Sequence, residues 1–168
     1  MAAALLLAGC AEDKPREPKA SAAPTVTVPT MPAAAEKNSE AGAIAFVKHY
    51  IDVFNYASNT GDVKELQKLS DPKCEGCTSY IELYAGTYAA GGFYKGGDWN
   101  VSNVITESQN GLLIVFAHVS AQAPQYRLNS DSGVKTGTPE DTDLSFVPKH
   151  ASNGWSIQEF GRQRGDAQ

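Results

Sequence analysis

Hydrophobic residues recur every third or fourth position in the first part of this chain and every second position in its last part. Between residues 40 and 59 the regularly spaced apolar side chains are Ile44, Val47, Tyr50, Ile51, Phe54 and Ala57. The polar residues Lys48 and Asp52 fall on the opposite side of the same helical wheel. This spacing predicts an amphipathic helix over 40–59 with one buried face.

Two shorter helices are predicted after the first. Thr60-Gly61 is a typical helix stop, and Asp62 followed by Glu65 has the spacing of a capping box, which predicts a second helix over 62–69. Asp71-Pro72 predicts the start of a third helix, because proline is favoured in a first helical turn. Gly91-Gly92 predicts its end.

The second half of the domain predicts strands. Trp99, Val101 and Ile105 suggest a strand with a bulge at Asn103, and Asn110-Gly111 signals a hairpin into the alternating run 112–123. After a polar segment over 129–141, the runs 143–149 and 154–160 predict a second hairpin. The predicted fold class is therefore α+β, with three N-terminal helices packed on an antiparallel sheet of about four strands.

The first residues predict an exported, lipid-anchored protein. The apolar run 2–9 is shorter than the roughly 20 residues that a membrane-spanning helix needs. It ends in Leu-Ala-Gly-Cys, which resembles the lipobox of bacterial lipoproteins, so we expect residues 1–9 to be a signal peptide and Cys10 to be lipidated. Because no Lys or Arg precedes the run, we expect this signal to be truncated. The expected location is the extracytoplasmic face of the cell membrane.

Composition divides the rest of the chain. Residues 10–39 are rich in Pro and Ala without apolar periodicity, which predicts a disordered tether, whereas 40–164 has the length and pattern of a single domain, followed by a tail at 165–168. The net charge of −5 comes without any cluster of cationic residues, which argues against nucleic acid as a partner. The expected partners are the membrane, through the lipid on Cys10, and an envelope protein or a small molecule.

The cysteines fit the same compartment. If lipid modifies Cys10, then Cys74 and Cys77 remain as an even pair, and in an oxidising exterior we interpret them as a structural disulfide. Their C-x-x-C spacing also admits a redox site, but no βαβ pattern precedes it. A metal site would need further ligands, and the histidines are scattered singly, so no metal and no cofactor is expected.

The sequence also resembles a family. The stretch 46–84, with Asn-Tyr-Ala, Thr-Gly-Asp and Cys-x-x-Cys, followed by Gly-Gly pairs before a tryptophan, resembles secreted actinobacterial lipoproteins of unknown function. The matching positions are Asn55, Tyr56, Ala57, Thr60, Gly61, Asp62, Cys74, Cys77, Tyr80, Gly91, Gly92, Gly96, Gly97 and Trp99. The order of helices and strands is similar to nuclear transport factor 2-like domains, which implies a cone in which a curved sheet wraps a helix.

Candidate site residues are few. Asp52 and His118 are weak candidates for acid–base catalysis, although Asp52 lies on a polar helix face. Tyr50, Tyr84, Trp99 and Trp155 are candidates for a ligand pocket, because aromatic residues with a polar group often line such pockets.

We interpret the protein as a non-enzymatic envelope module that binds a small ligand or a protein. The alternatives are a cone-fold enzyme of the isomerase or dehydratase type and a thiol oxidoreductase that uses Cys74 and Cys77.

Overall fold

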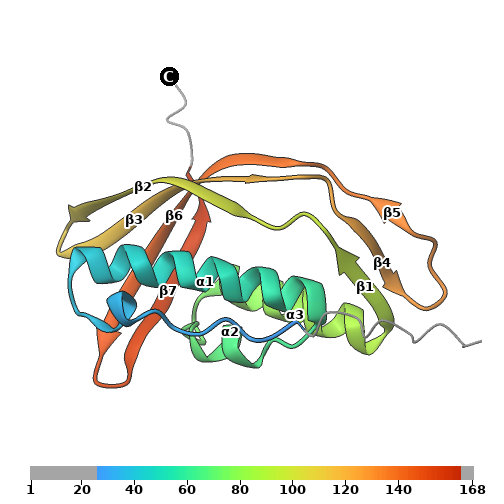
Figure 1. The fold of residues 1–168 in the computed structure, drawn as a ribbon, viewed down its shortest axis with the longest axis horizontal. Coiled ribbons are helices and arrows are strands. Elements are labelled where there is room, and N and C mark those ends of the chain that lie inside the picture. Colours follow the sequence, from blue (N-terminus) through green and yellow to red (C-terminus); the bar gives the residue numbers. More distant parts are fainter. Residues whose placement is uncertain (1–25, 164–168) are drawn as a thin grey trace, which may run out of the picture.

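A computed structural model describes residues 26–163, in which three α-helices cover one side of two antiparallel sheets (Figure 1). The helical elements are the 3-10 turn η1 (Ala33–Glu36), α1 (Glu40–Thr60), α2 (Lys64–Lys68) and α3 (Glu75–Ala89). The strands are β1 (Gly91–Lys95), β2 (Asn100–Gln109), β3 (Leu112–Ala121), β4 (Gln125–Asn129), β5 (Lys135–Thr136), β6 (Glu140–Ala151) and β7 (Gly154–Arg162). The predicted α+β class is confirmed.

The main sheet has four strands in the order β2-β3-β6-β7, all antiparallel, as the two hairpin signals predict. Asn103 has a positive φ of 49°, and the register shifts between Ser102 and Ile105, which confirms the predicted bulge. Figure 1 shows this sheet curving over the helices.

A second sheet of three strands, β1-β4-β5, was not predicted. Its strands are short, and β1 contains Gly91-Gly92, which the sequence marks only as a helix stop. The sheet forms by pairing between residues that are far apart in the sequence, such as Phe93 on β1 and Arg127 on β4, which lie opposite each other. Local sequence patterns carry no signal for such pairing.

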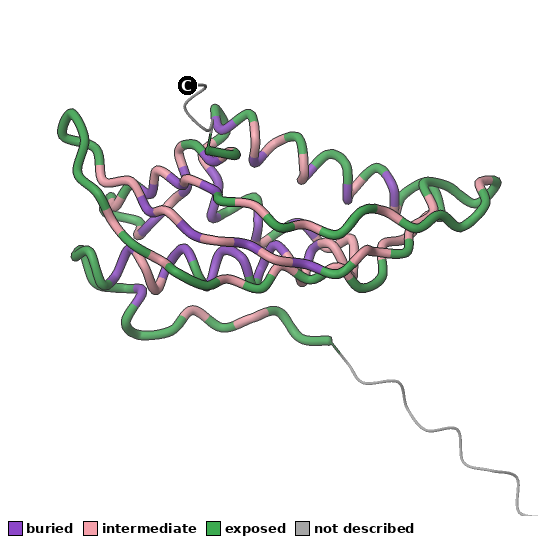
Figure 2. Tube along the Cα trace, turned by 90° about the horizontal axis from the view of Figure 1, so that it is seen from above, coloured by how far each residue is buried: buried purple, intermediate pink, exposed green. Residues whose placement is uncertain are grey.

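The core lies between α1 and the main sheet, and burial runs along the middle of both (Figure 2). On α1 the fully buried side chains include Phe46, Tyr50 and Phe54, as the helical periodicity predicts. They meet Val115, Phe146 and other inward-facing residues of the sheet. Loops at the two ends of the sheet are exposed (Figure 2).

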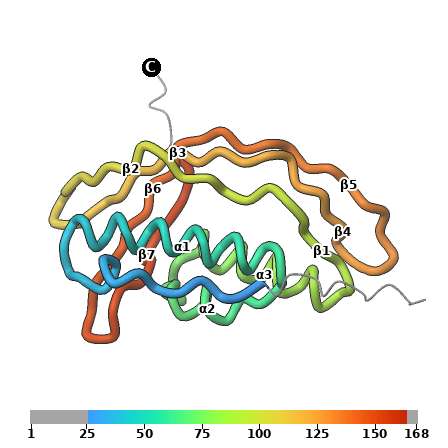
Figure 3. Tube along the Cα trace, in the orientation of Figure 1, coloured from blue at the N-terminus to red at the C-terminus, as the bar shows by residue number. Residues whose placement is uncertain are grey.

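The packed structure begins before the predicted domain boundary at residue 40. Residues 26–32 run alongside α1 (Figure 3), Met31 packs against the core, and Ala35 is buried. Gly42 permits this approach, since a Cβ atom there would lie 1.8 Å from the carbonyl oxygen of Lys37. Residues 31–39, which the sequence assigned to a disordered tether over 10–39, therefore pack against the domain, where the small Ala35 side chain and the absence of a side chain at Gly42 allow close approach.

Two predicted helix starts are also corrected. The third helix begins at Glu75 rather than at Asp71, because the Asp71 carboxylate accepts the backbone N–H of Lys73 and forms a turn. The second helix begins at Lys64, whose N–H bonds to Asp62 at 3.3 Å, while the Glu65 side chain pairs with Lys68 instead of completing a capping box.

The predicted stop at Gly61 is confirmed, since this residue caps α1 in the left-handed conformation. Within residues 26–163, no helix has the length and apolar character needed to cross a membrane.

Candidate functional site

An aromatic crevice lies between α3, the loop before β2 and the inner face of β6. It consists of two adjoining hollows of about 140 and 160 Å³, both lined by Tyr80, Trp99 and Glu140. Together they reach the lower end of the usual range for small-molecule pockets, about 300 Å³. The residues that line only one hollow include Tyr84, Tyr94, Pro124, Thr142, Phe160 and Arg162.

Helix α3 supplies one wall of the crevice. Tyr80 and Tyr84 are four residues apart, so both rings leave the same helix face. The Tyr80 ring stacks on Phe160 with a centroid distance of 5.8 Å and meets Trp99 edge to face at 5.7 Å. These contacts hold the rings in fixed orientations, which favours a preformed site.

Asn55 on α1 fixes the position of Trp99. Its side chain accepts the Trp99 backbone N–H at 2.9 Å and donates to the Trp99 carbonyl oxygen at 3.0 Å. The indole then stacks on Phe54 with a centroid distance of 4.3 Å. A single amide side chain therefore anchors the start of β2 to the first helix.

The chain between β1 and Trp99 turns at Gly96 and Gly97, whose φ angles of 70° and 75° favour glycine. Nearby, the Tyr88 hydroxyl lies 2.8 Å from the Ser58 carbonyl oxygen and 3.0 Å from that of Tyr94. These contacts place Tyr94 against the crevice, where its ring meets Tyr84 edge to face.

An ion pair stands at the mouth of the crevice. Arg162 Nη2 donates to both carboxylate oxygens of Glu140, at 2.7 and 2.9 Å. The Arg162 side chain is 65% exposed and that of Glu140 only 26%. Among residues 26–163 the guanidinium has no other side-chain partner.

Burial raises the pKa of Tyr80, and the nearby Glu140 carboxylate raises it further, while Arg162 opposes that effect. Burial also raises the pKa of Tyr84. Both phenols therefore stay neutral at physiological pH, and each can donate or accept a hydrogen bond without acting as a base.

The structure brings together only some of the pocket residues named from the sequence. Tyr84 and Trp99 line the crevice. Tyr50 is fully buried in the core, where its hydroxyl lies 3.0 Å from Ser70 Oγ. Trp155 lies at the far end of the sheet, in a separate groove beside the β6–β7 hairpin.

The two acid–base candidates lie away from the crevice. Asp52 is exposed on α1. His118 points to the outer face of the sheet, because its neighbours Ala117 and Val119 point into the core. Its ring nitrogens lie 3.0 Å from Asp143 and 3.4 Å from Asp141.

Cys74 and Cys77 form the predicted disulfide. Cys74 caps the N-terminus of α3, where its sulfur accepts the Cys77 N–H at 3.2 Å. The two cysteines are 1% and 0% exposed, so a second thiol has no access to either sulfur in the folded state. This burial argues against a thiol oxidoreductase. Cys10 lies outside the described residues.

No group of three metal-ligating side chains comes together in the described part of the chain. Sequence reasoning missed Asn55, Tyr94, Glu140 and Arg162 as site residues. Asn55 and Tyr80 lie in the stretch that carries the family resemblance, whereas Glu140 and Arg162 lie at the open end of the β6–β7 hairpin, just outside its predicted strand ranges.

Comparison with known proteins gives a family and a fold. Residues 18–160 match the model of a family of unknown function, DUF6318. None of the curated proteins matches the chain. Among solved structures, the intermembrane space region of the chloroplast protein ARC6 is similar with a TM-score of 0.54 and 13% identity, over 77% of this chain and 99% of that one.

Two bacterial structures are also similar. One is a protein of the NTF2-like family from Streptomyces avermitilis, with a TM-score of 0.42, 14% identity, and coverage of 73% of this chain and 95% of that one. The other is an NTF2-like protein with a cystatin-like fold from Novosphingobium aromaticivorans, with a TM-score of 0.41, 12% identity, and coverage of 72% and 82%.

Proposed function

The chain belongs to the family of unknown function DUF6318, and we propose that it is a lipid-anchored envelope protein whose aromatic crevice binds a small ligand without catalysing a reaction. The observation that carries the binding proposal is the joint lining of two hollows by Tyr80, Trp99 and Glu140. Fixed aromatic rings with a few polar groups are the usual lining of small-molecule sites.

The shape and charge of the crevice suggest the ligand chemistry. Each hollow has about the size of the engineered apolar cavity, about 150 Å³, that accepts benzene. At the mouth, Arg162 contacts Glu140 through one nitrogen, and its remaining donors suit a carboxylate. The proposed ligand therefore has a compact apolar or aromatic body and one anionic group.

A fragment titration tests the crevice. Benzoate, toluene and benzylamine are added to the full chain carrying Cys10→Ser, and amide shifts are followed by NMR. Benzoate should bind most tightly and benzylamine most weakly, because the Arg162 guanidinium attracts an anion. Benzoate should shift the amide signals of Trp99 and of residues in α3. Equal binding of all three would contradict the anionic part of the proposal.

Matched variants locate the binding. Thr142 lines the crevice, so Thr142→Phe should fill the hollow and abolish the benzoate shifts. Thr136→Phe, on exposed β5, should leave them unchanged. Benzoate binding that survives Thr142→Phe would place the fragment outside the crevice.

Attachment to the membrane is a separate part of the proposal and rests on the Leu-Ala-Gly-Cys sequence ending at Cys10. Two or more acyl chains on this cysteine would give stable anchoring, at roughly 0.8 kcal/mol per buried methylene. Cys10→Ala in the producing bacterium should release the protein from the membrane fraction, and intact mass should show acyl chains on the unaltered protein only. Retention of the Cys10→Ala variant in the membrane fraction would contradict lipid anchoring through Cys10.

A further inference from the structure

The outer face of the main sheet carries apolar side chains where the solvent side of an antiparallel sheet is ordinarily polar. Strand alternation sets this face, since Val115, Ala117 and Val119 point into the core and their neighbours point out. We call the outward apolar residues the outer platform: Ile105, Leu112, Ile114, Phe116 and Val147. Ile105 is 56% exposed and Leu112 is 55% exposed.

Strand register makes the platform continuous. Ile105 lies directly opposite Phe116 across β2 and β3. Val115 on β3 lies opposite Phe146 on β6. The next residues, Ile114 and Val147, therefore both point outward at the same level of the two strands. Cross-strand neighbours on one face lie about 5 Å apart, so these side chains form one surface.

A groove opens at one end of the platform. Strands β3 and β6 pair only as far as Val115 and Phe146, after which the β2–β3 and β6–β7 hairpins diverge (Figure 1). The space between them, the hairpin groove, has a volume of about 510 Å³. Its lining includes Leu112, Leu113, Val147, Pro148, Lys149 and Trp155.

The hairpin groove has unused hydrogen-bonding groups. Residues 112–114 and 147–149 have no strand partner across it. Trp155 is only 8% exposed, and its indole Nε1 has no hydrogen-bond partner among the described residues. A buried donor without a partner is uncommon in folded proteins and suggests a site that another molecule completes.

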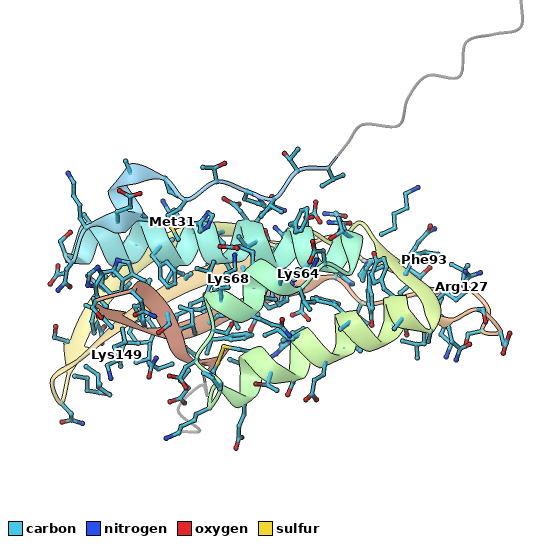
Figure 4. The ribbon with its side chains drawn as sticks, turned by 90° about the horizontal axis from the view of Figure 1, so that it is seen from below. Met31, Lys64, Lys68, Phe93, Arg127 and Lys149 are labelled. Atoms are coloured by element: carbon cyan, nitrogen blue, oxygen red, sulfur yellow. A yellow bond between two sulfur atoms is a disulfide. The ribbon has the colours of Figure 1, made fainter. Side chains whose placement is uncertain are left out.

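Charge indicates the kind of partner. Glu107 lies opposite Ile114 and Glu159 opposite Val147, so an exposed carboxylate stands on each side of the apolar row. In the part of the chain that the structure describes, neither carboxylate has an ion-pair partner. The groove also has one cationic side chain in its lining, Lys149. Figure 4 shows Lys149 at the end of the molecule opposite to Phe93 and Arg127.

We propose that the outer platform and hairpin groove bind an extended segment of a partner protein that carries apolar residues and Lys or Arg at every second position, and therefore on one face. Its apolar residues would contact the platform and its cations, on the same face of the segment, would meet Glu107 and Glu159, while the segment backbone would add to the unpaired strand edges, as in β-strand addition. A second copy of this chain, with its net charge of −5, would bring acidic rims together. This proposal does not depend on the aromatic crevice.

Two strand-length synthetic peptides of equal length test the proposal. The Val-Lys peptide carries Val and Lys in turn at every second position with Ser between them, and the Val-Glu peptide has Glu in place of Lys. Each is titrated into the full chain carrying Cys10→Ser and followed by NMR. The Val-Lys peptide should shift the amides of residues 112–114, Val147 and Lys149, and its affinity should fall as salt is raised. No binding, or equal binding of the two peptides, would overturn the proposal.

Charge reversal supplies the matched control. Glu107→Lys with Glu159→Lys should weaken the Val-Lys peptide about tenfold or more, since two attractions become repulsions. Asp52→Lys with Glu82→Lys changes the net charge equally on the exposed helical side and should preserve binding. An equal loss of peptide affinity in both double variants would show that overall charge alone causes the effect, and would refute the docking site.

Two other occupants have their own signatures. If the platform instead holds a second copy, sedimentation velocity would show a dimer that Ile105→Asp converts to monomer. If it holds a membrane, vesicles of anionic lipid would bind the Cys10→Ser chain and Ile105→Asp would release it. Either result would overturn the proposal of a basic partner segment.

Discussion

Replacing Asn55 with Ala removes the contact that fixes Trp99 in the crevice. Two hydrogen bonds are lost, at 2.9 and 3.0 Å, and the Trp99 backbone N–H and carbonyl are left in a partly buried place. At about 1 kcal/mol for each bond, with a further cost for unpaired groups, the free energy of unfolding should fall by about 2–3 kcal/mol.

Urea denaturation followed by far-UV circular dichroism measures this change. With an m-value of about 2 kcal/mol/M, the midpoint for Asn55→Ala should fall by about 1–1.5 M. Asn59→Ala is the matched control, because it removes the bond from Asn59 Nδ2 to the exposed Asp98, at 2.6 Å, together with a second bond to the Asn55 carbonyl oxygen. That control should lose about 0.5–1 kcal/mol.

A second readout connects Asn55 to the site. With β2 less firmly anchored, benzoate should bind Asn55→Ala more weakly than it binds Asn59→Ala. If Asn55→Ala unfolds within about 0.5 kcal/mol of the unaltered chain, the Asn55–Trp99 contact does not hold the crevice together and the reasoning fails.

Three further predictions concern the core and the disulfide. Replacing Cys74 and Cys77 together with Ala should lower the free energy of unfolding by about 2 kcal/mol, as expected for a loop of this length, measured by urea denaturation; no change would show that the bridge does not constrain the unfolded chain. Burial lowers the pKa of His49 from its usual value, so the unfolded state binds a proton more readily than the folded one. Stability should therefore fall as pH drops from 7 toward 5, and His49→Gln should flatten that slope; an unchanged slope would remove His49 as its source. Burial raises the pKa of Tyr50 to about 12, so between pH 10 and 12 the unfolded state ionises first and stability should fall by up to roughly 2–3 kcal/mol; thermal melts of Tyr50→Phe should show a smaller fall, and an equal fall would contradict the assignment.

The sequence predicts the parts of the fold that depend on local periodicity. Helix α1 and the β2–β3 and β6–β7 hairpins have strong apolar patterns and turn residues, and each occurs near its predicted range. The β1-β4-β5 sheet was missed because its strands are short and pair over long distances, as Phe93 does with Arg127. The predicted start of the third helix was wrong because the Asp71 carboxylate accepts the backbone N–H of Lys73 and forms a turn.

Only part of the candidate site could be predicted from the sequence. Tyr84 and Trp99 were chosen as aromatic residues with a polar group, and the structure places both at one crevice. The same criterion also selected Tyr50, which is buried in the core, because residue type alone does not distinguish a core tyrosine from a pocket tyrosine. Glu140 and Arg162 lie at the open end of the β6–β7 hairpin, just beyond the strand ranges 143–149 and 154–160 that the sequence predicts, so no sequence pattern gave a reason to pair them.

The central claim is that the aromatic crevice is a ligand site, and a crystallographic fragment soak tests it most directly. Crystals of the protein in which the crevice is free of lattice contacts are soaked with a set of compact aromatic carboxylates. The account predicts fragments between α3 and β6, with their rings against Tyr80 and Trp99 and their carboxylates at Arg162. An empty crevice in crystals whose fragments bind elsewhere, such as the groove beside Trp155, would contradict it.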